Sequence, residues 1–248
     1  MIEYVSCSEH ELIVNAREKY DDFLLFSEEA IILLTKSFVS VHPKCDVFLL
    51  FFSQIQKALT LSLLATIRKH DVQSSLMLRI ALESSIYAGY ALDKTNVFDF
   101  VNIDENGFAH ENENVKKKAL KWIDDNYNHF SITFKNYKDM INSSAAHSNI
   151  LSAFNNFSIG IKDSITINLF DNDSTEMVKE RLWWIGNITF CIVDFLRTVI
   201  KDYPMVKLYD NFNQELFDIS RLNDFLEDQL LKNPNYKRTR DIQIHSGE

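Results

Sequence analysis

Glycine and proline are scarce in this chain, with five glycines and three prolines among 248 residues. Average usage in globular proteins is roughly 7% and 5%, respectively. Folds rich in β-strands need a turn about every ten residues, and these two residue types form most such turns. The sequence therefore disfavours multi-stranded sandwiches, barrels and glycine-rich phosphate-binding folds. It predicts an all-α protein built from long helices.

Apolar periodicity and helix-breaking residues divide the chain into predicted helices. These run over residues 9–38, 46–69, 71–92, 115–141, 173–203 and 213–231. A break near His129 would split the fourth of them, so a multi-helix bundle of six or seven helices is expected. The joint at His70-Asp71 is short, which should make the second and third helices antiparallel neighbours. Residues 1–232 are expected to form a single helical-bundle domain, followed by a polar, basic, flexible tail at residues 233–248.

Two segments depart from the helical pattern. Residues 93–114 are polar and aperiodic, which predicts a surface loop with room for a short helix at Val97–Val101. Further along, Phe157-Ser-Ile and Ile165-Thr-Ile carry β-branched alternation on either side of Gly160. This pattern predicts a small β-hairpin insertion near residues 155–171.

The net charge is −9 at pH 7, which disfavours sequence-independent binding to nucleic acid. Such binding depends on a basic surface that releases counterions. Nucleic acid could be bound only through a local basic patch, and the tail with Lys237, Arg238 and Arg240 is the segment that stands out. The interpretation weighed against this is a solvated terminus.

The cysteines and the apolar stretches point to the cytoplasm. Cys7, Cys45 and Cys191 are widely spaced and lack a Cys-x-x-Cys pair, so neither a disulfide framework nor a structural zinc site is expected. The first residues lack the basic and apolar regions of a signal peptide. The most apolar segment begins at Val47 but is interrupted by glutamines and Lys57, which indicates a core helix rather than a membrane span.

The third predicted helix carries an unusual pair of charges. Between Asp71 and Asp93 lie 21 residues, of which only Arg79 and Glu83 are charged and eight are glycine, alanine or serine. Small residues let neighbouring helices approach closely, so this helix is expected to be buried on several sides. Arg79 and Glu83 stand four residues apart and share a face. Arginine before glutamate is the less favourable order for an exposed pair, so a buried pair is expected.

Two interpretations of this pair stay open. The structural one is a buried ion pair that also bonds to polar groups of a neighbouring helix. The functional one is a polar pocket in which Arg79 presents its guanidinium to an anionic group while Glu83 orients it.

The run Leu78-Arg-Ile-Ala-Leu-Glu83, then Tyr87, then a serine-rich turn with His147-Ser148, resembles an uncharacterised family of bacterial all-helical proteins. That family is similar to the HEPN (higher eukaryote and prokaryote nucleotide-binding) bundles of toxin–antitoxin and phage-defence systems. The resemblance covers residues 45–200. It implies that Arg79, Glu83 and His147 converge in one catalytic cluster, and that Tyr87 joins them as a ligand-binding residue.

The sequence departs from the pattern of the ribonuclease members of that class. Those members carry Arg-x4–6-His near the start of a late helix. Here the spacing occurs only in the tail, between Arg238 or Arg240 and His245, where no helix is predicted. The departure puts nuclease activity in doubt.

Two acidic motifs do not predict metal sites. His110, Glu111 and Glu113 lack a spacing that would place ligands on one helix face, even with Asp104 and Glu105 nearby. Asp171-Asn-Asp173 resembles the start of a calcium loop but lacks the glycine and the distal glutamate. We interpret it as the exit of the hairpin and as a capping box of Asp173 and Glu176. No metal and no cofactor are therefore expected.

Three functional hypotheses follow. The first is a protein that acts mainly through protein–protein interaction, as a component of a defence, toxin–antitoxin or stress system. The second is a HEPN-like metal-independent ribonuclease or nucleotide-binding protein that uses His147 as general acid or base and Arg79 to stabilise phosphate charge. The third is an architectural homodimer built on the first and last helices.

Overall fold

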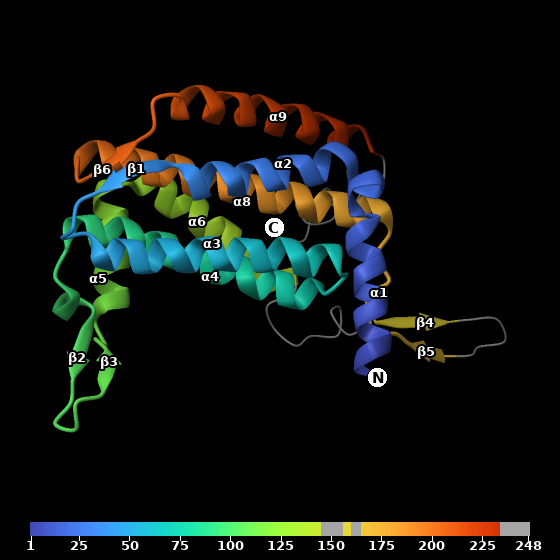
Figure 1. Ribbon diagram of the computed structural model, residues 1–248, viewed down its shortest axis with the longest axis horizontal. Coiled ribbons are helices and arrows are strands. Elements are labelled where there is room, and N and C mark those ends of the chain that lie inside the picture. Colours follow the sequence, from blue (N-terminus) through green and yellow to red (C-terminus); the bar gives the residue numbers. More distant parts are fainter. Residues whose placement is uncertain (145–155, 160–164, 234–248) are drawn as a thin grey trace, which may run out of the picture.

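The structure is a computed structural model that describes residues 1–144, 156–159 and 165–233, and it confirms an all-α multi-helix fold. Figure 1 shows the arrangement of its elements. The α-helices in the described residues are α1 (Ile2–Val14), α2 (Ala16–Lys36), α3 (Asp46–Ile67), α4 (Asp71–Asp93), α5 (Val115–Asn126), α6 (Asn128–Ser144), α8 (Thr175–Asp202) and α9 (Phe212–Lys232).

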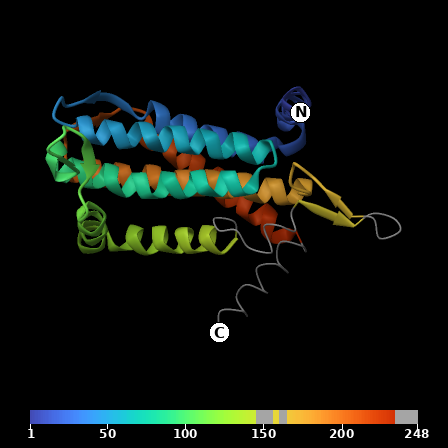
Figure 2. The same cartoon turned by 90° about the horizontal axis from the view of Figure 1, so that it is seen from below.

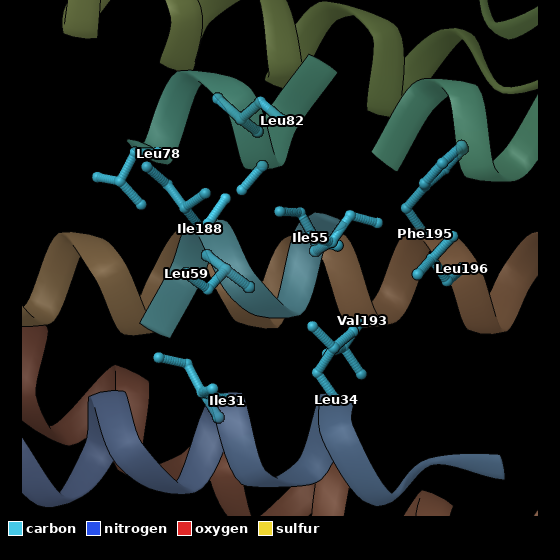
Figure 3. Packing of buried hydrophobic residues seen from close by; sticks show 14 of the residues in the cluster. Ile31, Leu34, Ile55, Leu59, Leu78, Leu82, Ile188, Val193, Phe195 and Leu196 are labelled. Atoms are coloured by element: carbon cyan, nitrogen blue, oxygen red, sulfur yellow. The ribbon is translucent and has the colours of Figure 1, made fainter. Parts of the chain in front are cut away.

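The core lies between α2, α3, α4 and α8. The two most extensive helix pairs are α3 with α4 and α2 with α8. Figure 3 shows side chains from all four helices meeting there, and several of them are fully buried, among them Ile55, Leu59 and Phe195. Helix α9 packs on α2 and α8, while α5 and α6 lie in a separate layer against α4 (Figure 2).

The joint between α3 and α4 is as short as predicted. Arg68 caps α3, Lys69 adopts a positive φ of 59°, and the backbone N–H of His70 donates to the carbonyl of Ala65. A left-handed residue just after a helix is a common way to reverse the chain. The two helices are antiparallel neighbours, so this expectation is confirmed.

Three two-stranded antiparallel sheets accompany the helices in the described residues. The predicted hairpin is confirmed as β4 (Phe157–Ile159) with β5 (Ile165–Ile167). In the surface loop predicted for residues 93–114, the short helix expected at Val97–Val101 is confirmed as a 3-10 turn at Val97–Asp99. The prediction is wrong in that the loop also holds a second hairpin. The strands of that hairpin are β2 (Val101–Ile103) and β3 (Ala109–Glu111), and the third sheet pairs β1 (Phe38–Val41) with β6 (Val206–Leu208).

The first predicted helix also needs correction. Helical structure begins at Ile2 rather than Glu9, and the helix is interrupted at Asn15, between α1 and α2. A second bend lies inside α2 at Asp21, where φ is 45°. Helix α1 has no buried residue, so no strong apolar face marked it in the sequence. The break expected near His129 is confirmed between α5 and α6, and the extra helix α1 brings the α-helices in the described residues to eight.

By length and composition alone, α3 and α8 could each cross a membrane. Both pack inside the bundle, with about half of the most apolar window of α3 and somewhat more of that of α8 buried. Core packing accounts for the buried part of their apolar character.

Two glycines allow close helix packing. A Cβ atom at Gly89 would lie 2.7 Å from Cζ of Phe195, and one at Gly186 would overlap the ring of Phe26. Phe26 is fully buried, so its ring has little room to move. The contact at Gly89 confirms the expectation that small residues on α4 let a neighbouring helix approach closely. Gly186 has the same role on α8, where it allows close approach of α2.

Replacing Gly186 with alanine is expected to lower the free energy of unfolding by about 1–3 kcal/mol, because overpacking outweighs the better helix propensity of alanine. Chemical denaturation measures this change. The variant Phe26→Leu/Gly186→Ala should recover part of the loss by making room for the methyl group. A Gly186→Ala protein as stable as the wild type would contradict the close contact.

Candidate functional site

Arg79 and Glu83 lie on the face of α4 that is turned toward α6. Nε of Arg79 is 3.5 Å from Oε1 of Glu83, and the two side chains are 28% and 33% exposed. The expectation of a sealed, buried ion pair is therefore wrong. The small residues of α4 bring other helices close on its remaining faces, whereas α6 covers this face only in part.

Helix α6 supplies two further partners for this pair. Nη1 of Arg79 donates to Oδ1 of Asn142 at 2.9 Å, and Nζ of Lys138 lies 2.5 Å from Oε1 of Glu83. Burial alone would raise the pKa of Glu83, but Lys138, Lys116 and Arg79 together hold that pKa below its usual value. Glu83 is therefore a carboxylate at neutral pH, and Lys138 is its nearest cation.

Tyr87 does not bond to Arg79 or Glu83. Its hydroxyl donates to Oε1 of Glu111 at 3.3 Å, and its ring stacks on Phe51 with the centroids 5.1 Å apart. Burial, together with the Glu111 carboxylate, raises the pKa of Tyr87 to about 12. Tyr87 thus remains protonated and links strand β3 to α4.

His147, the third residue of the expected catalytic cluster, lies outside the described residues, as do Arg238, Arg240 and His245 of the tail.

An open cleft of about 370 Å³ lies between α4, α5 and α6. Glu83 and Tyr87 line it, whereas Arg79 does not. The apolar residues of the lining are Leu82, Ile86, Ala119, Leu120 and Phe134. Ligand sites in proteins are usually concave, apolar and of this size, with a few polar groups that fix orientation. The cleft is therefore the candidate binding site of the described residues.

Charged side chains surround this apolar lining. Lys116 stands on the α5 wall and Lys135 on the α6 wall, and neither forms a salt bridge with a described residue. Lys138 is engaged by Glu83. Of the acidic residues, Asp124 accepts a hydrogen bond from Ser131, and Asp139 completes the charged lining. The lining therefore holds three lysines and three carboxylates around its apolar residues, and two of the lysines form no salt bridge with a described residue.

Sequence analysis missed this basic region. Residues 115–142 contain six lysines and three aspartates, in a chain whose net charge is −9. The lysines are divided between two helices that pack together, so their proximity shows only in the folded structure. The detectable signal was the run Lys116-Lys117-Lys118 at the start of α5.

A second polar cluster fixes the far end of α4. Nε of Arg181 lies 2.9 Å from Oδ1 of Asp71, and its guanidinium also pairs with Asp173, which is 1% exposed. Burial and the neighbouring carboxylates Asp171 and Asp173 outweigh Arg181 and raise the pKa of Asp71 to about 6. Nζ of Lys69 donates to the carbonyl of Asp173 at 2.9 Å, which joins α3 to the segment before α8.

The predicted capping box needs correction in this cluster. The N-cap of α8 is Ser174, which accepts a hydrogen bond from the N–H of Met177, rather than Asp173. Asp171 caps a different helix, because its Oδ2 accepts from the backbone N–H of Asp71 at the start of α4, at 2.6 Å. These carboxylates join α4 to the segment before α8 and to α8 itself. The described residues contain no group of three potential ligands placed to bind a metal ion.

No protein-family model, no curated protein and no solved structure matches this chain. The similarity to HEPN bundles stays a prediction. The functional argument therefore depends on the cleft itself.

Proposed function

We propose that this protein acts through protein–protein interaction, and that the α4–α5–α6 cleft receives an apolar, negatively charged segment of its partner. The observation that carries this proposal is that an apolar cleft is lined by two lysines, Lys116 from α5 and Lys135 from α6, that form no salt bridge with a described residue. The apolar lining would supply most of the binding free energy, because burying apolar surface is the dominant favourable term in association. The lysines would select for negative charge and speed the encounter.

The charge distribution supports an acidic partner segment. The chain as a whole is acidic, whereas residues 115–142, which supply the α5 and α6 sides of the cleft, carry six lysines and three aspartates. This segment is a local reversal of sign, although the lining itself holds three lysines and three carboxylates. Like charges facing each other across an interface suppress wrong partners. The described contacts lend the ribonuclease hypothesis less support. Its acid or base, His147, lies outside the described residues, and the guanidinium of Arg79 is already engaged by Asn142 and Glu83.

The fluorescent probe 1-anilinonaphthalene-8-sulfonate tests the cleft, because it combines an aromatic body with a negative charge. We expect saturable binding of one probe molecule per chain at low protein concentration. Reversing both charges in Lys116→Glu/Lys135→Glu should weaken binding by about tenfold, since each exposed charge contact contributes roughly 0.2–1 kcal/mol. Fluorescence titration measures the dissociation constant.

The matched control is Lys57→Glu, a charge reversal at an exposed lysine on α3 outside the cleft. It should bind the probe as the wild type does. Leu120→Asp, which places a charge in the apolar lining, should also weaken binding. Equal affinity in the wild type and in all three variants would overturn the assignment of the cleft as a binding site.

A further inference from the structure

The β2–β3 hairpin is an ordered element that projects from the bundle. Figure 1 shows it standing away from the helices, and both strands are largely exposed. Its turn is well formed, because Oδ1 of Asp104 accepts hydrogen bonds from the N–H groups of Asn106 and Phe108, both at 2.9 Å. Gly107 completes the turn with a φ of 84°, a conformation that favours glycine.

The hairpin carries large apolar side chains in solvent. Ile103 is 59% exposed and Phe108 is 67% exposed, and Phe98, just before the hairpin, is 58% exposed. A group of exposed apolar residues on one projecting element is typical of an interaction site. Negative charge accompanies it, from Asp104, Glu105, Glu111 and Glu113.

The hairpin therefore has the chemistry that the cleft requires. The hairpin is apolar and acidic. The cleft is apolar, and two of its sides come from α5 and α6, which carry six lysines and three aspartates over residues 115–142. The size also fits, because a cavity of about 150 Å³ holds a benzene-sized ring. The cleft of about 370 Å³ has room for the Phe108 ring and a second side chain such as that of Ile103.

The base of the hairpin adjoins the cleft of its own chain. Tyr87 lines the cleft and donates to Glu111 of β3, and Lys116 follows in the first turn of α5. From this base the hairpin extends away from the bundle, so its tip stands clear of the helices of its own chain (Figure 1). Hairpin and cleft lie close together on each chain, so a two-fold axis between two copies would satisfy both contacts at once.

We infer that the partner of the cleft is a second copy of this chain. In the resulting two-fold dimer, the β2–β3 hairpin of each copy inserts Phe108 into the α4–α5–α6 cleft of the other. Lys116 and Lys135 face the acidic residues of the inserted hairpin. This inference rests on the proposed function, because it names the occupant of the same cleft.

Sedimentation velocity of the full chain over a range of concentrations tests the dimer. The wild type should be a dimer, whereas Phe108→Asp and Leu120→Asp should each be monomeric or dissociate at concentrations at least tenfold higher. Circular dichroism checks that the variants are folded. Phe217→Asp is the matched control, because Phe217 is an equally exposed phenylalanine on α9, far from both surfaces in the sequence, and it should leave the dimer intact.

Mixing the two monomeric variants gives the sharper test. The Leu120→Asp chain keeps an intact hairpin and the Phe108→Asp chain keeps an intact cleft, so an equimolar mixture should form a heterodimer through one of the two contacts. A wild type that stays monomeric at its highest soluble concentration would overturn the inference. So would a dimer that Phe108→Asp and Leu120→Asp leave unchanged, or a mixture that shows no heterodimer.

The probe experiment separates this failure from failure of the proposed function. The Phe108→Asp chain retains its own cleft and should bind 1-anilinonaphthalene-8-sulfonate at least as tightly as the wild type, since no hairpin competes. If the wild type is monomeric and its probe binding is weakened by Lys116→Glu/Lys135→Glu, the dimer is overturned and the cleft is supported as a binding site. If the wild type is monomeric and the lysine substitutions leave probe binding unchanged, both the dimer and the proposed function are overturned.

Discussion

Replacing Arg181 with methionine is expected to lower the free energy of unfolding by about 3–5 kcal/mol at pH 7. Arg181 is the cation that Asp71 and Asp173 share, and both carboxylates are largely removed from solvent. Without it, Asp71 and Asp173 would lie close together in a medium that solvates charge poorly, so each would have to stay an unpaired anion or take up a proton, and both cost free energy. Urea denaturation at pH 7 measures the effect.

The matched control is Arg197→Met. Arg197 pairs with Asp194 three residues earlier on the same helix, and about a quarter to a third of each side chain is exposed. Its loss should cost less than about 1 kcal/mol, as for other solvent-accessible pairs. If Arg181→Met cost no more than this control, the Asp71–Arg181–Asp173 cluster would not be the main link at this end of the bundle. Adding Asp71→Asn and Asp173→Asn to Arg181→Met should recover much of the stability.

Asp71 should make the protein less stable as the pH rises from about 4 to 7. Its pKa is raised from the ordinary value of 3.8 to about 6 in the folded protein, so the folded state binds the proton more tightly than the unfolded state. The contribution is fully present below the unfolded pKa and is lost as the pH rises through the folded pKa. A shift of this size corresponds to about 3 kcal/mol.

Comparing the wild type with Asp71→Asn isolates this contribution, since the other titrating groups are common to both chains. The difference in unfolding free energy should favour the wild type most near pH 4 and should decline toward pH 7. Denaturation curves at several pH values measure it. Parallel stability profiles for the two proteins would show that Asp71 titrates normally and would contradict its burial among carboxylates.

Local sequence patterns predicted the elements that depend on neighbouring residues. The long helices α3, α4 and α8, the short joint at His70 and the β4–β5 hairpin follow from apolar periodicity, breaking residues and β-branched alternation. The pairing of β1 with β6 was missed, because it joins short strands about 165 residues apart and neither strand carries a pattern of its own. The first half of α1 and the break that follows this helix were missed, because α1 buries no residue.

The candidate site, too, was only partly predictable from the sequence. Arg79 and Glu83 stood out in the sequence because they are the only charged residues between Asp71 and Asp93. Lys138 and Asn142, which complete the pair, belong to another helix and could not be assigned from spacing along α4. The lysine-walled cleft was missed for the same reason, since Lys116 and Lys135 come together only when α5 and α6 pack beside α4.

The sequence by itself determined the class of this protein. Few glycines and prolines leave few places to turn, and long apolar periodicities bury their faces only by packing helix on helix. Tertiary structure alone decided how far the Arg79–Glu83 pair is buried, where the cleft between α4, α5 and α6 lies and how exposed Phe108 is. Those properties depend on which surfaces meet. Periodicity shows that a helix has an apolar face, but only the packed bundle shows how much of a neighbouring face stays open to a partner.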